Sequence, residues 1–95
     1  MKEKKKTLEQ LREEMDVVDE EIIQAFRNRM RISSEIAKYK KENGLSILDI
    51  DREKSKLDRI VKNDEDDLAA FTSKLYLVLA DLSKEYQTII YNKED

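Results

Sequence analysis

The sequence contains no cysteine, histidine, proline or tryptophan, and its one glycine is Gly44. Without cysteine or histidine the chain cannot form disulfides, thiolate nucleophiles, histidine-based triads or the common zinc sites. The lack of proline and the single glycine leave almost no helix-breaking residues, and the remaining composition favours helices. We therefore expect an all-α fold, with any chemistry supplied by charged and amide side chains.

The charges nearly cancel, because 19 lysines and arginines face 22 aspartates and glutamates, for a net charge of −3. A general nucleic-acid or anionic-membrane binder would have a large basic surplus, so any anion site must be a local cluster. No stretch approaches the roughly 18 apolar residues of a membrane span. The basic N-terminus also lacks the apolar segment of a signal peptide. A cytoplasmic protein without nucleic-acid or membrane partners is expected.

Apolar residues recur every three or four positions, which predicts helices at about 7–42, 50–62 and 67–92. Gly44 and the turn-forming stretch NDEDD, residues 63–67, separate them. Aspartates that can cap the second and third helices are Asp49, Asp51, Asp66 and Asp67.

The first predicted helix is long for a chain of one domain, residues 1–95. About 35 helical residues make a rod of roughly 50 Å, which two shorter helices cannot cover fully. Part of its apolar seam should therefore pack on a second copy of the chain, in a helical homodimer. The seam consists of Leu8, Leu11, Met15, Val18, Ile22, Ala25, Ile32, Ile36 and Tyr39, with Arg29 in its midst.

Arg29 stands where this seam calls for an apolar side chain, and two explanations are open. A lone polar residue can fix the register or the oligomeric state of packed helices. Alternatively, Arg29 faces an internal anion pocket together with Lys40, which lies on the same helix face about 16 Å along the axis. Two unmatched cations on an inward face are costly unless an anion meets them.

Other polar residues are unspecific when each is taken alone. Arg12 can be a solvated charge at the edge of the seam. It lies about 25 Å from Arg29 along one helix, so the two can contact one small ligand only from different chains. The segment DIDRE, residues 49–53, can be an ordinary acidic helix start. Ser83 and Gln87, one turn apart, can simply flank the apolar stripe of the third helix.

The order and spacing of these residues together resemble the all-helical (AroQ-class) chorismate mutases, from about Leu8 to Gln87. The resemblance implies three helices in an intertwined homodimer with two shared active sites. It also implies the conversion of chorismate to prephenate, a unimolecular Claisen rearrangement in phenylalanine and tyrosine biosynthesis, with no cofactor and no metal. The matching segments are LREEMDVVDEEII (11–23), RNRMRISSEIAKYK (27–40), DIDRE (49–53) and SKEYQ (83–87).

The resemblance gives three residues roles at the reacting atoms. Arg29 would grip a substrate carboxylate, Lys40 would bond the ether oxygen and a carboxylate, and Gln87 would bond the ether oxygen from the other side. The rearrangement needs no nucleophile and no proton transfer, so a chain without cysteine and histidine can support it. It needs a flexible dianion held in a compact conformer, with positive charge where the C–O bond breaks.

The resemblance assigns the remaining residues to substrate binding. Ser83 and Arg52 would help to hold the carboxylates, Asp49 and Glu53 would address the ring hydroxyl, and Arg12 would reach in from the other subunit.

Two alternatives stay open at this stage. An isochorismate pyruvate lyase on the same scaffold binds a similar dianion, although the intact DIDRE segment favours the mutase. A non-catalytic helical dimerisation module would use Arg29 only as a register device. The chain resembles a monofunctional mutase, and its segment between the second and third helices is short for the family.

Overall fold

A computed structural model describes residues 5–63 and 67–93 and shows three α-helices in that part of the chain. Helix α1 spans Leu8–Glu42, α2 spans Ile50–Asn63, and α3 spans Ala69–Tyr91. The all-α prediction is confirmed, and each predicted boundary lies within two residues of the observed one. No helix among these residues is long and apolar enough to cross a bilayer.

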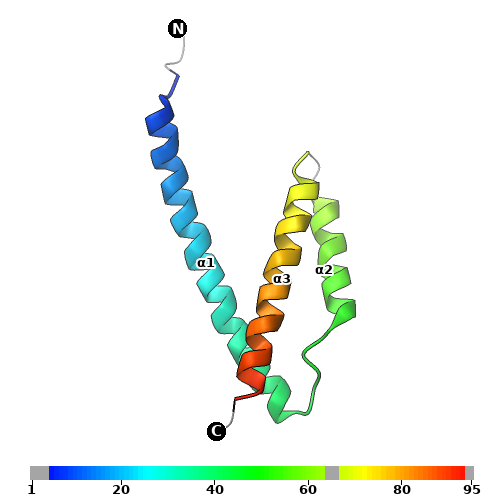
Figure 1. The fold of residues 1–95 in the computed structure, drawn as a ribbon. Coiled ribbons are helices and arrows are strands. Elements are labelled where there is room, and N and C mark those ends of the chain that lie inside the picture. The colour runs from blue at the N-terminus through cyan, green and yellow to red at the C-terminus, as the bar shows by residue number, and fades with distance from the viewer. Residues whose placement is uncertain (1–4, 64–66, 94–95) are drawn as a thin grey trace.

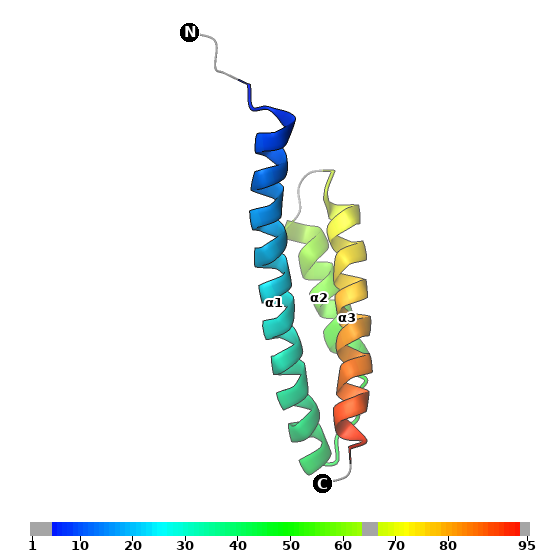
Figure 2. The ribbon, with the colours of Figure 1, turned by 60° about the vertical axis from the view of Figure 1, so that its left-hand side comes forward.

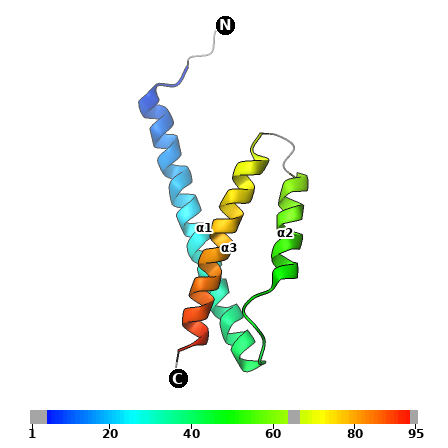
Figure 3. The same ribbon diagram turned by 45° about the vertical axis from the view of Figure 1, so that its right-hand side comes forward.

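Helix α3 is central, because it packs against both α1 and α2 (Figures 1 and 3). The first turns of α1 extend beyond both other helices (Figure 2), and its N-terminal half diverges from α3 (Figure 1). The radius of gyration is 18.2 Å, against about 12–13 Å for a compact chain of this length. A single chain is therefore an open and elongated arrangement, in which only the C-terminal half of α1 is covered.

Local interactions set both ends of α1. At its start, Thr7 and Gln10 form a capping box: Gln10 N donates to Thr7 Oγ1 at 3.1 Å, and Thr7 N donates to Gln10 Oε1 at 2.8 Å. At its end, Gly44 has a φ of +63°, the left-handed conformation that glycine adopts without a steric penalty. Leu45 N donates to Lys40 O at 2.8 Å, which completes a Schellman turn. This turn sends the chain back toward α2.

The two shorter helices begin differently. Asp49 caps α2, because its Oδ1 accepts a hydrogen bond from Arg52 N at 3.0 Å. Helix α3 has Leu68 at its N-cap position and no acidic residue in its first turn. The expectation that Asp67 caps this helix is wrong, because Leu68 has the N-cap position and Asp67 lies one residue earlier, in the turn. Asp66 lies outside the described residues.

The contact between α1 and α3 has small residues at its centre. The buried residues are Ser33 and Ala37 of α1 and Ala80, Ser83 and Gln87 of α3. Small side chains let two helix backbones approach closely, but they bury little apolar area. Many larger apolar side chains remain exposed in the single chain. On α1 they include Leu8, Leu11, Met15, Val18 and Ile22, and on α3 Phe71, Leu75 and Val78.

Candidate active site

A cavity of about 260 Å³ lies where the three helices and the α1–α2 loop come together. Its wall carries apolar groups and a concentration of charged and amide groups. The lining residues are Arg29, Ile32, Ser33, Ile36 and Lys40 from α1, Ile47 and Asp49 from the loop, Arg52 and Glu53 from α2, and Tyr76, Ala80, Ser83, Lys84 and Gln87 from α3.

Arg29 reaches from α1 across to polar groups of α3. Its Nη1 donates to the Leu79 carbonyl oxygen at 3.0 Å and also to Ser83 Oγ. The guanidinium is half-buried at the cavity wall. A planar guanidinium has five N–H donors in a fixed fork, so holding it at one nitrogen from α3 orients the whole group. The seam therefore accepts a cation at this position because α3 offers it oxygen acceptors.

Lys40 is held at the opposite end of the cavity by the loop. Its Nζ donates to the Ile47 carbonyl oxygen at 2.8 Å. This carbonyl is within reach because the left-handed turn at Gly44 folds the loop back beside the last turn of α1. An ammonium group has three donors, so this single contact leaves it able to bind a ligand in the cavity.

The start of α2 places two charges of opposite sign at the wall. The cap made by Asp49 fixes the first turn of α2, which carries Arg52 and Glu53. Glu53 Oε1 lies 3.2 Å from Lys84 Nζ of α3, so an ion pair joins the two helices at the cavity.

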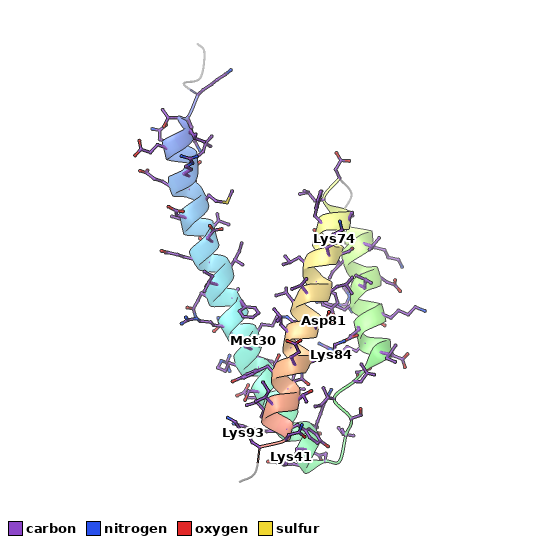
Figure 4. The ribbon with its side chains drawn as sticks, viewed as in Figure 1. Met30, Lys41, Lys74, Asp81, Lys84 and Lys93 are labelled. Atoms are coloured by element: carbon purple, nitrogen blue, oxygen red, sulfur yellow. The ribbon has the colours of Figure 1, made fainter. Side chains whose placement is uncertain are left out.

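Lys84 takes part in a second ion pair, with Asp81 Oδ1 at 3.4 Å (Figure 4). The pKa of the Lys84 ammonium is raised above its ordinary value of 10.5, chiefly by the hydrogen bond to Glu53, with Asp81 adding to it and partial burial opposing it. The side chains of Lys84 and Glu53 are each 32% exposed, whereas that of Asp81 is 71% exposed. Glu53 is therefore the partner at the cavity, and Asp81 is the partner at the surface.

Gln87 contributes an unusual group, a buried amide oxygen. The residue is 8% exposed, and its Oε1 has no hydrogen-bond partner among the described residues. An unsatisfied buried polar atom costs free energy and calls for an explanation. A carboxamide can turn either its oxygen or its NH₂ group toward the cavity. A ligand that bonds to Gln87 there would account for its position.

The structure brings together the predicted site residues with one exception. Arg12 is exposed on the part of α1 that extends beyond the other helices, and it does not line the cavity. The residues that do line it are Arg29, Lys40, Asp49, Arg52, Glu53, Ser83 and Gln87.

Sequence reasoning missed several lining residues, notably Ser33, Tyr76 and Lys84. A signal for Lys84 was present. It follows Ala80 by four positions and precedes Gln87 by three, so it shares their helix face.

The formal charges of the described lining residues leave a surplus of two positive charges, with four cationic groups against two carboxylates. Cations stand at both ends of the cavity, and hydrogen-bonding side chains lie between them. Such a wall suits a small organic dianion, because charge-assisted contacts can hold two carboxylates in a fixed orientation.

The chain matches the protein family described as chorismate mutase type II over residues 11–88. No curated protein and no solved structure matches the chain. The matched span contains all of α2, all but the first three residues of α1 and the last three of α3, the whole cavity lining, and Arg12. Because this match covers most of its length, the chain belongs to the chorismate mutase type II family.

Proposed function

We propose that the chain catalyses the rearrangement of chorismate to prephenate in its three-helix cavity. The observation that carries this proposal is the arrangement of Arg29, Lys40 and Gln87 around one cavity with two surplus positive charges. The substrate is a dianion, and the reaction breaks one C–O bond while it forms one C–C bond within the same molecule. No co-reactant is needed, so binding geometry and electrostatics supply the catalysis.

Arg29 has the role of holding one substrate carboxylate. Its contacts with Leu79 O and Ser83 fix the guanidinium before substrate arrives. A fixed guanidinium can meet a carboxylate with two parallel hydrogen bonds, which sets orientation as well as position. Arg52, at the start of α2, serves the other carboxylate.

Lys40 and Gln87 act on the ether oxygen. Negative charge builds on this oxygen as the C–O bond breaks, so donors aimed at it stabilise the transition state more than the ground state. Lys40 supplies a charged donor. Gln87 supplies a neutral donor, its NH₂ group, on a side chain that is already buried. Asp49 and Glu53 accept hydrogen bonds from the ring hydroxyl.

The working unit in this proposal is an intertwined homodimer with two shared active sites. The single chain leaves large apolar side chains exposed along the N-terminal half of α1 and along α3. Monomeric soluble proteins rarely expose continuous apolar surfaces of this kind. A partner that covers this half of α1 can also receive Arg12, which lies on the same segment. Each site would then combine Arg12 of one chain with Arg29 of the other.

The test is to incubate the purified chain with chorismate, follow the loss of its ultraviolet absorbance, and identify the product by chromatography. Formation of prephenate supports the proposal. Activity on isochorismate with release of pyruvate would instead identify a lyase, and no turnover of either compound would indicate a non-catalytic module. If the proposal holds, the activity places the chain in phenylalanine and tyrosine biosynthesis, with the cytoplasm as its expected location.

A further inference from the structure

Lys84 lines the cavity, yet neither the family resemblance nor the roles proposed above give it a task. It lies on the α3 face that also carries Ser83 and Gln87, and its side chain extends toward α2 (Figure 4). Its Nζ is 3.2 Å from Glu53 Oε1. An ordinary surface ion pair has two well-solvated side chains, whereas these two are each only about one-third exposed and border the cavity.

The pairing matters because Glu53 brings a negative charge to the cavity in which the dianionic substrate would bind. A bare carboxylate at the wall would repel both substrate carboxylates, and this repulsion is strong where water is partly excluded. Lys84 offsets that charge. Without it, the described lining would have one surplus positive charge instead of two. The hydrogen bond also restricts where the Glu53 carboxylate can lie, so that it stays available to a hydroxyl group.

We infer that Lys84 is a positioning residue for substrate binding, which holds the Glu53 carboxylate at the cavity wall and cancels its repulsion of a dianionic substrate. This inference rests on the proposed function. The contacts concerned involve the ring hydroxyl and the carboxylates, which change little between the bound substrate and the transition state. Interactions that are equal in the two states affect KM more than kcat.

Lys84→Met tests the inference, because it keeps the length of the side chain and removes the charge. We expect KM for chorismate to rise about tenfold while kcat stays within about threefold of wild type. Lys84→Arg should restore KM to within about threefold, since it keeps the charge and the pairing. Lys74→Met is the matched control: it makes the same charge change on α3, at a lysine that does not line the cavity, and should leave KM unchanged.

A double-mutant cycle separates this role from a purely structural tether between α2 and α3. If Lys84 acts through Glu53, Lys84→Met in a Glu53→Gln background should raise KM by less than about threefold further. A tether would instead lower the thermal unfolding midpoint and leave KM near that of wild type. Lys84→Gln serves as a second uncharged variant if Lys84→Met does not fold.

An unchanged KM in the folded uncharged variants, or fully multiplicative effects in the cycle, would overturn the inference while wild type still turns over chorismate. Failure of wild type itself to turn over chorismate would overturn the proposed function, and the inference with it. The two failures are therefore distinguishable.

Discussion

Replacement of Arg29 by lysine tests whether this position grips a carboxylate or only fixes the packing of helices. In the free protein, Nη1 of Arg29 bonds to two acceptors on α3, which orients the rest of the guanidinium fork. Lysine keeps the charge but has a single nitrogen at the end of a flexible chain, so it cannot hold α3 and make a two-bond contact with a carboxylate together.

The size of the effect follows from the bonds lost. A hydrogen bond to a charged group contributes about 1.5–3 kcal/mol, and each 1.4 kcal/mol corresponds to about a tenfold change. Arg29→Lys should therefore lower kcat/KM for chorismate by roughly 10- to 150-fold, while circular dichroism and the oligomeric state stay like wild type. Arg31→Lys is the matched control, because Arg31 is exposed two positions away and pairs only with Glu35 among the described residues.

If Arg29 only fixes the register of the packed helices, the opposite result is expected. Arg29→Lys would then keep full activity, or would change the oligomeric state and lose activity in proportion to that change. Either result would refute the carboxylate contact. Loss of activity in Arg31→Lys to the same degree would show that the effect of an Arg→Lys change is not specific to the cavity position.

Three further predictions follow from other groups. Gln87→Glu should be active only at acidic pH, because only a protonated carboxyl can donate to the ether oxygen. The rate of wild type should be nearly constant from pH 6 to 8. A Glu variant as active as wild type at pH 8 would argue against this role. Gly44→Ala should lower the free energy of unfolding by about 1–2 kcal/mol, from the left-handed backbone alone, since an added Cβ has no atom within 4 Å; Gly44→Asn should cost less in a denaturant titration, and equal losses would contradict this. The pKa of Lys84 is raised in the folded state, so the stability that its ammonium confers is complete below pH 10.5 and is lost as the pH rises through the folded pKa. The difference in unfolding free energy between wild type and Lys84→Met should therefore shrink above that pH. A constant difference would count against the pairing.

The sequence predicted the helices well because their signals are local. The apolar spacing, the capping residue Asp49 and the single Gly44 each act within a turn or two of the chain. The start of α3 was predicted two residues early, because Asp67 is a good capping residue by type, whereas the N-cap position is Leu68 and Asp67 lies in the preceding turn.

The site was predictable only in part, for a physical reason. Periodicity shows that Arg29 and Lys40 share a face, but it does not show what they meet. Their acceptors, Leu79 O and Ile47 O, are backbone atoms brought close by tertiary packing and by the turn at Gly44. Every residue offers such a carbonyl, so no sequence pattern identifies these two. The pairing of Lys84 with Glu53 likewise depends on how α2 lies against α3.

The predicted role of Arg12 involves a second chain, so the structure of one chain does not test it. It is exposed and away from the cavity, as the distance along one helix predicts. Its assignment to a partner's site remains a prediction, and it is joined in the proposal to the exposed apolar surface on the same half of α1.

The most direct test of the account is complementation between two inactive variants. Arg12→Ala and Arg29→Ala should each be nearly inactive alone, because every site in either homodimer lacks one arginine. After co-expression, or mixing and refolding, random exchange makes half of the dimers mixed, and each mixed dimer has one complete site of two. Activity with chorismate should then recover to roughly one quarter of wild type. No recovery, in a sample whose mixed dimers are confirmed by mass spectrometry, would contradict an active site built from Arg29 of one chain and Arg12 of its partner.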